Sequence, residues 1–255
     1  MLQIQAHRQG RKALWVVQEH ESNQTAFALV LAGYGDAWAA VELGRGMGPS
    51  HTLLALQPPD GDGGSAAALP AAELAALYVR NLTAAWPREP YFLGGYSAGA
   101  LLALEMARQL KAQGRAVGLV AMFDPLFLRY SLPARVGWSV LERTVRLLSP
   151  IAGGTRPVKI LSAMTQDQGL RRHLRTLEGH RPQPYDGRVV LIEANWSRLV
   201  RTPGFLKGWR RIARGGLDRW HPGGTHHGFM RPPHVGRLGR KLGEWMTQSA
   251  RGRAE

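Results

Sequence analysis

The stretch from Tyr91 to Gly114, YFLGGYSAGALLALEMARQLKAQG, decides the fold. It opens with the apolar residues Tyr91 to Leu93 and passes through a pair of glycines. It then continues from Ala98 to Gln113 in a run rich in Ala and Leu. Such a run favours a helix, and a glycine directly after it is a common helix end. The stretch therefore predicts a buried strand, a tight turn and a long helix.

The same alternation extends outward on both sides. Apolar runs predict further buried strands, and longer Ala- or Leu-rich segments predict further helices. The strands are expected at 26–31, 52–56, 116–123 and 188–194, and the helices at 38–47, 71–86 and 233–248. Strands that are apolar on both faces and alternate with helices are typical of a parallel sheet. The expected fold class is α/β, a mostly parallel sheet with helices on both faces.

The amino-acid composition excludes several kinds of site and segment. The length of 255 residues suits one α/β domain, and the absence of cysteine excludes disulfides, thiolate metal sites and a cysteine nucleophile. No apolar stretch is long enough to span a bilayer, and the first residues lack the apolar core of a secretory signal. A cytoplasmic protein without a membrane partner is expected.

The chain is strongly cationic. Its 33 Lys and Arg outnumber its 18 Asp and Glu, which gives a formal net charge of +15 and favours acidic partners. No nucleic-acid-binding motif accompanies the charge, so no nucleic-acid partner is expected. The densest basic stretch, Lys207 to Arg211, is either a docking patch or the exposed face of a helix with Trp209 turned inward.

A G-x-S-x-G motif, Gly95 to Gly99, lies between the central strand and its helix. That context is the one that a nucleophile elbow requires, with the serine strained at the tip of a tight turn. Ser97 is therefore the candidate nucleophile. The alternative is a glycine-rich turn that merely permits close packing.

A serine hydroxyl needs a base to take its proton, and on this fold the chain order is serine, then acid, then histidine. Asp124 ends the apolar strand 116–123 and is the candidate acid, although an Asp followed by Pro125 is also a common turn former. Glu193 is the rival acid. It is disfavoured because it lies within the strand 188–194 instead of beyond it.

Four histidines cluster late in the chain: His221, His226, His227 and His234. The middle two lie in a loop before the final helix, where the third member of a catalytic triad is expected. A metal site is the alternative, but the H-E-x-x-H pattern is absent, so no metal is expected. An oxyanion hole needs two backbone donors, expected from Ala98 and from the loop that begins near Leu31.

The chain resembles the thioesterase domains that terminate nonribosomal peptide synthetases and polyketide synthases. The resemblance extends over residues 26–246. It is carried by the stretch 91–125, by PQPYDGRVVLIEA at 182–194 and by GWRRIARGGLDRWHPGGTHHGFMRPPHV at 208–235. It implies an α/β-hydrolase fold. The chain departs from the family pattern in having Leu31-Ala32-Gly33 before the oxyanion loop, and in an added N-terminal hairpin of 13–21 with 25–31.

Residue by residue, the resemblance implies a role for each candidate. Ser97 matches the acyl-accepting nucleophile, Asp124 the acid, and Leu31 and Ala98 the oxyanion amides. His226 matches the base through the G-x-H pattern at 224–226, and His227 is the alternative base one residue later. The resemblance implies no metal and no cofactor of the protein's own.

The resemblance also implies the domain organisation. Residues 1–255 would form a single thioesterase domain, and residues 126–182 a helical lid inserted within it over the acyl channel. An apolar stripe in that segment suits a helix, which is either a lid or an ordinary excursion packed on the sheet. The stripe consists of Trp138, Leu141, Val145 and Leu148.

The implied reaction is the release of an acyl or peptidyl chain by hydrolysis or macrocyclisation, in polyketide or nonribosomal peptide biosynthesis. The chain would arrive as a thioester on the phosphopantetheine of an acyl or peptidyl carrier protein and pass through an acyl-serine. Two other functions stay open. One is a small-molecule carboxylesterase or lipase on the same fold, and the other is a noncatalytic cationic binding protein.

Overall fold

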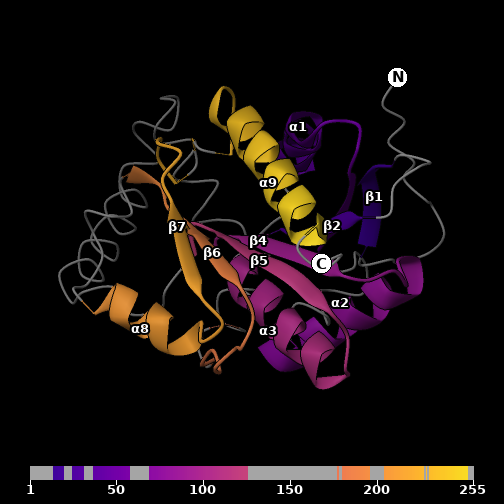
Figure 1. Ribbon diagram of the computed structural model, residues 1–255, viewed down its shortest axis with the longest axis vertical. Helices are drawn as coiled ribbons and strands as arrows, with labels where there is room; N and C mark the ends of the chain where they lie inside the picture. The colour runs from indigo at the N-terminus through magenta and orange to yellow at the C-terminus, as the bar shows by residue number, and fades with distance from the viewer. Residues whose placement is uncertain are drawn as a thin grey trace, which may run out of the picture.

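The architecture is that of a computed structural model. The structure describes residues 14–19, 25–31, 37–57, 69–125, 177, 180–195, 204–226, 228 and 230–251. In this part of the chain a twisted sheet runs through the middle of the molecule, with helices on both of its faces (Figure 1). The predicted α/β fold class is confirmed.

Seven strands form one sheet in the described residues, in the order β1-β3-β2-β4-β5-β6-β7. They are β1 Leu14–Gln18, β2 Ala26–Val30, β3 Thr52–Leu56, β4 Tyr91–Tyr96, β5 Val117–Phe123, β6 Val189–Ile192 and β7 Leu217–Trp220. Only β1 pairs antiparallel; the other neighbours are parallel. Every residue of β2, β3, β4 and β6 is buried, as expected for strands covered on both faces.

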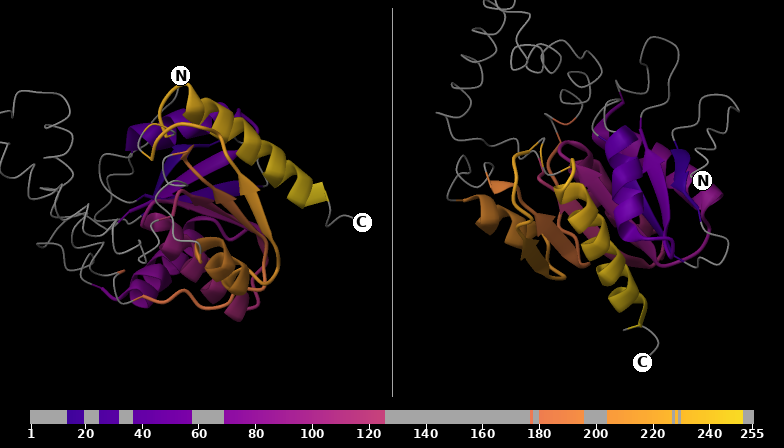
Figure 2. Two further views of the ribbon diagram at one scale, coloured as in Figure 1. Left: turned by 90° about the vertical axis from the view of Figure 1, so that its left-hand side faces the viewer. Right: turned by 90° about the horizontal axis from the view of Figure 1, so that it is seen from above.

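The helices of the described residues divide between the two faces of the sheet. They are α1 Ala37–Met47, α2 Ala71–Ala85, α3 Gly99–Ala112, α8 Phe205–Ile212 and α9 His234–Arg251. Helices α1 and α9 lie together on one face, and α2, α3 and α8 cover the other (Figure 2). Helix α3 follows the central strand β4 directly and is buried along most of its length.

The expected N-terminal hairpin is wrong. Strand β1 pairs with β3, with Leu14 opposite Leu56, and does not pair with β2. Both edges of β2 are already taken, by β3 on one side and β4 on the other. A hairpin needs the two strands to be neighbours, so β1 joins the sheet at its edge instead.

One strand of the described chain was not predicted, and one helix was predicted only as one of two interpretations of the basic stretch 207–211. Strand β7 reads LDRW and is only partly buried, so it lacks the apolar run that marks the other strands. Helix α8 carries the basic stretch identified in the sequence. Trp209 is fully buried in it, whereas Lys207 and Arg211 are exposed. The stretch is therefore an exposed helix face with its tryptophan turned inward.

Helices α1 and α9 pack closely through glycines. A Cβ placed on Gly239 would lie 2.4 Å from the carbonyl oxygen of Leu43, and one on Gly46 would lie 2.7 Å from that of Gly236. Contacts that short do not occur in folded proteins, so either side chain would push the helices apart. A Cβ on Gly236, in contrast, meets no atom within 4 Å.

We expect Gly239→Ala to lower the free energy of unfolding by about 1 to 3 kcal/mol, because it overpacks this crossing. Gly236→Ala is the matched control in the same helix. It should raise that free energy by about 0.5 to 1 kcal/mol, because alanine is the better helix former and has room. Urea titrations of the two variants check the prediction, and equal effects would contradict the close crossing.

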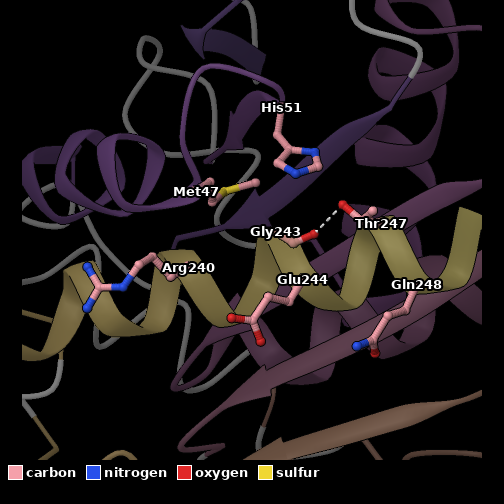
Figure 3. Close-up of a pocket in the computed structure, with 7 residues that line it drawn as sticks. All are labelled: Met47, His51, Arg240, Gly243, Glu244, Thr247 and Gln248. Atoms are coloured by element: carbon pink, nitrogen blue, oxygen red, sulfur yellow. Dashed lines mark hydrogen bonds between the residues drawn. The ribbon is translucent and has the colours of Figure 1, made fainter.

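A shallow hollow of about 440 Å³ lies where the end of α1 meets α9 (Figure 3). His51 points toward the α9 backbone there, where Thr247 Oγ1 donates a hydrogen bond of 2.9 Å to the Gly243 carbonyl. The imidazole is mostly buried, and burial lowers the pKa of His51. The hollow is lined by Met47, His51, Arg240, Gly243, Glu244, Thr247 and Gln248.

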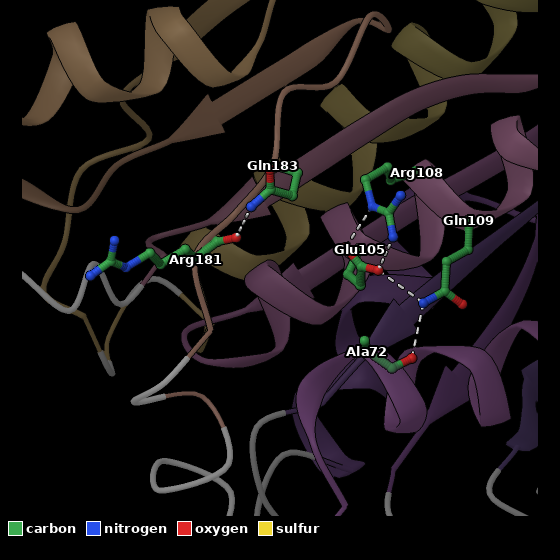
Figure 4. Close-up of polar contacts among 6 residues, drawn as sticks. All are labelled: Ala72, Glu105, Arg108, Gln109, Arg181 and Gln183. Atoms are coloured by element: carbon green, nitrogen blue, oxygen red, sulfur yellow. Dashed lines mark hydrogen bonds and ion pairs between the residues drawn. The ribbon is translucent and has the colours of Figure 1, made fainter.

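A buried carboxylate of α3 holds the glutamine side chain that joins α3 to α2 (Figure 4). Glu105 is 3% exposed and accepts hydrogen bonds from Arg108 Nε at 2.9 Å, Arg108 Nη2 at 2.7 Å and Gln109 Nε2 at 2.9 Å. The same Gln109 amide donates to the Ala72 carbonyl of α2 at 2.9 Å. Burial alone would raise the pKa of Glu105, but the hydrogen bonds from Arg108 and Gln109 outweigh it and lower that pKa.

A lowered pKa in the folded state means that Glu105 stabilises the fold above the usual carboxyl value of 4.5 and loses this contribution as the pH falls. We expect Glu105→Gln to lower the free energy of unfolding at pH 7 by about 1 to 3 kcal/mol. Between pH 6 and pH 3 the variant should lose less stability than the parent. Thermal unfolding across this range measures both effects. Glu73→Gln, at an exposed position of α2, controls for the loss of one charge, and parallel pH curves for Glu105→Gln and the parent would contradict the argument.

Candidate active site

The G-x-S-x-G motif forms a sharp turn between β4 and α3. Ser97 follows the last residue of β4 and has a φ of 55°, and its amide donates to the Phe123 carbonyl at 2.9 Å. A Cβ on Gly95 would lie 2.1 Å from the Gly99 carbonyl oxygen, and one on Gly99 would lie 2.4 Å from that of Val30. Glycine is therefore required on both sides of the serine, and the turn has the geometry expected of a nucleophile elbow.

Asp124 occupies the matching position after the neighbouring strand β5. Its φ is 44°, in the left-handed region that aspartate tolerates better than most residues. Its amide donates to the Ile192 carbonyl at 2.7 Å, and its Oδ1 accepts a hydrogen bond from the Ala194 amide at 3.3 Å. The side chain is almost completely buried. These bonds to the end of β6 hold the carboxylate in a fixed orientation.

His226 lies in the loop between β7 and α9. Its Nδ1 is 2.6 Å from Asp124 Oδ2, and its Nε2 is 3.2 Å from Ser97 Oγ. When the Nδ1 proton is directed at the carboxylate, Nε2 can accept the proton of the serine hydroxyl. Three residues that are distant in sequence thus form one chain of hydrogen bonds at the carboxyl ends of β4, β5 and β7.

The rival acid has a different partner. Glu193 is 1% exposed, and its Oε2 lies 2.8 Å from both Nε and Nη2 of Arg219 and 3.7 Å from His221 Nε2. The structure therefore brings Asp124, and not Glu193, to the imidazole of His226. His227, the alternative base, lies outside the described residues.

The backbone amides of the two expected oxyanion donors differ in their hydrogen bonding. Ala98 caps α3 and is fully buried, and its amide has no backbone acceptor among the residues described here. The amide of Leu31, however, donates to the Leu56 carbonyl at 2.9 Å. The hydrogen bonding of β2 with β3 continues one residue beyond the strand, so this amide is committed to the sheet. An amide that already donates to a carbonyl is not available to an oxyanion, so the expected role of Leu31 as an oxyanion donor disagrees with this hydrogen bond.

The remaining expectations fall partly outside the described chain. Of the predicted lid, 126–182, only Leu177 and residues 180–182 are described. The apolar stripe of the lid therefore lies outside the described residues, at Trp138, Leu141, Val145 and Leu148. The lid stays a prediction.

In the described part, no three His, Asp or Glu side chains are grouped to hold a metal ion. The hollow beside His51 is lined by none of the three hydrogen-bonded residues.

Comparison with known proteins decides the family. A family model described as the thioesterase domain matches residues 33–183, more than half of the chain. The chain belongs to the thioesterase domain family. The matched region of this thioesterase domain includes Ser97 and Asp124, whereas His226 follows it.

Two relatives illustrate the likeness. Thioesterase frbE of Dothideomycetidae sp. (strain 11243) is 25% identical to this thioesterase domain over 250 residues, which cover 93% of this chain and 91% of frbE. The non-reducing polyketide synthase cla3 of Cladosporium cladosporioides is 29% identical over 177 residues, 68% of this chain. The chain spans only 8% of the length of that synthase.

Solved structures share the fold. One of them is the thioesterase domain SrfTE, which cyclizes the lipopeptide antibiotic surfactin. It superposes on this chain with a TM-score of 0.61. It is 19% identical, and the match covers 94% of this chain and 97% of SrfTE.

Among the described residues, none of the helices combines the length and the apolar character that a membrane span requires.

Proposed function

We propose that this thioesterase domain releases an acyl or peptidyl chain from the phosphopantetheine thioester of a carrier protein, through an acyl-serine. Ser97 acts as nucleophile, His226 as general base and acid, and Asp124 as the residue that orients the imidazole. The observation that carries the proposal is the continuous hydrogen-bond chain from Ser97 Oγ through His226 to Asp124, in a member of the thioesterase family.

In the first half-reaction, His226 Nε2 accepts the Ser97 hydroxyl proton while Oγ attacks the thioester carbonyl. The carbonyl oxygen becomes an oxyanion, which accepts a hydrogen bond from the Ala98 amide at the start of α3. The intermediate collapses with cleavage of the C–S bond. His226 returns its proton to the departing sulfur, so the products are a free thiol and an acyl-serine.

In the second half-reaction, His226 removes a proton from an attacking nucleophile. Water gives the free acid, whereas a hydroxyl or amine of the bound chain gives a ring. Cleavage of the ester bond returns the proton from His226 to Ser97 Oγ. Throughout, the buried Asp124 carboxylate keeps the Nδ1–H directed toward itself and stabilises the imidazolium that forms in each half-reaction.

The proposed partner is an acyl or peptidyl carrier protein, and the enzyme needs no cofactor of its own. The similarity to the polyketide synthase cla3 supports a thioester-bound substrate. A net charge of +15 favours an acidic partner. We further propose that residues 1–255 form one domain in which the segment 126–182 covers the acyl channel.

Intact-mass spectrometry tests this function. The protein is incubated with acyl-N-acetylcysteamine thioesters of increasing chain length and with the same acyl groups on a carrier protein. We expect the mass of one acyl group on the parent and none on Ser97→Ala. Faster turnover of p-nitrophenyl esters with no reaction of any thioester would instead indicate a carboxylesterase, and labelling of Ser97→Ala would refute the acyl-serine.

A further inference from the structure

Tyr96, the residue between Gly95 and Ser97, makes two contacts with His226. Its hydroxyl donates a hydrogen bond of 2.9 Å to the His226 backbone carbonyl. Its ring stacks on the imidazole, with centroids 5.0 Å apart and planes inclined by 26°. Tyr96 ends β4 and is 5% exposed, so it is itself held firmly in the sheet.

These contacts restrain motions that Asp124 leaves open. The bond between His226 Nδ1 and Asp124 fixes one edge of the imidazole, but the ring can still swing about that bond and carry Nε2 away from Ser97 Oγ. A ring stacked on its face blocks this swing. The loop is also tied to the sheet by the bond of 2.9 Å from the Asn195 amide to the Gly224 carbonyl. The Tyr96 hydroxyl adds an anchor at His226 itself.

We propose that Tyr96 is a positioning residue for His226, an inference that rests on the proposed function. Because Tyr96 precedes Ser97 directly, one backbone segment fixes both the nucleophile and the support of its base. The aromatic face also attracts the positive charge of the imidazolium that forms during the reaction. Its contribution therefore falls mainly on the chemical step and little on substrate binding.

Two substitutions separate the contacts. Tyr96→Phe keeps the stacked ring and removes the hydrogen bond, and we expect it to lower kcat about fivefold. Tyr96→Leu removes both contacts, and we expect a loss of about 50-fold. KM for an acyl-N-acetylcysteamine thioester should stay the same in both variants. The rate of labelling by a fluorophosphonate, which needs no particular acyl chain, should fall in parallel.

Tyr91→Phe is the matched control. Tyr91 begins the same strand, and its buried hydroxyl has no hydrogen-bond partner in the described part of the chain. The same deletion of one hydroxyl should leave kcat unchanged there. The NMR signal of the Nδ1 proton of His226 gives a second readout: Tyr96→Phe should increase its exchange with solvent, whereas Tyr91→Phe should not.

The outcomes distinguish the two proposals. If Ser97→Ala is inactive while Tyr96→Phe matches the parent in kcat, labelling rate and Nδ1 exchange, the positioning role is wrong and the proposed function stands. If Ser97→Ala keeps the parent activity, the proposed function itself fails. A loss in Tyr96→Phe that appears only in KM, or only as a lower melting temperature, would also overturn the positioning role.

Discussion

Replacement of Ser97 with alanine is expected to lower kcat/KM for an acyl thioester by about 10,000-fold or more. The change removes one oxygen atom, the one 3.2 Å from His226 Nε2, and leaves the base without a nucleophile to activate. Steady-state hydrolysis and intact-mass labelling measure the loss.

Folding of this variant is checked directly, since Ser97 lies in a strained turn with a φ of 55°. Alanine has the same Cβ, so the far-UV circular dichroism spectrum and the melting temperature should stay close to those of the parent. A folded Ser97→Ala protein that hydrolyses thioesters within tenfold of the parent rate would contradict the assignment of Ser97 as the nucleophile.

Replacement of Asp124 with asparagine should lower kcat by about 1,000- to 10,000-fold. An amide NH₂ in place of the carboxylate donates to Nδ1, so the ring proton moves to Nε2. The imidazole then holds the wrong tautomer and cannot accept the Ser97 proton. The Ala194 amide still finds an acceptor in the asparagine oxygen, so the fold should be kept.

Glu193→Gln is the matched control for Asp124→Asn. Both residues are buried carboxylates at the ends of neighbouring strands, but Glu193 is paired with Arg219. The change at Glu193 should reduce stability and leave kcat within about threefold of the parent, because its carboxylate is hydrogen-bonded to Arg219 and not to the imidazole of His226. If Glu193→Gln lost more activity than Asp124→Asn, the acid would be assigned wrongly. Unfolding curves of both variants separate stability from chemistry.

The sequence by itself determined the central part of the site. The glycines at 95 and 99 and the apolar strand before them predict an elbow at Ser97. The structure gives the physical reason: a Cβ on either glycine would lie only 2.1 or 2.4 Å from a backbone carbonyl oxygen. The placement of Asp124 after β5 also follows from local pattern, since an apolar run ends there and the fold order demands an acid. The sheet itself was predictable for the same reason: buried strands are apolar along their whole length.

Only the tertiary structure decided which strands are neighbours and which side chains meet. An apolar run shows that a strand is buried but not beside which strand, so β1 was expected beside β2 and lies beside β3. Strand β7 has no apolar run at all, since it lies at the edge of the sheet. The contacts of His226 with Asp124 and Tyr96 join positions that are 102 and 130 residues apart. Such contacts leave no periodic trace in the sequence, because they depend on how the loops at one edge of the sheet converge.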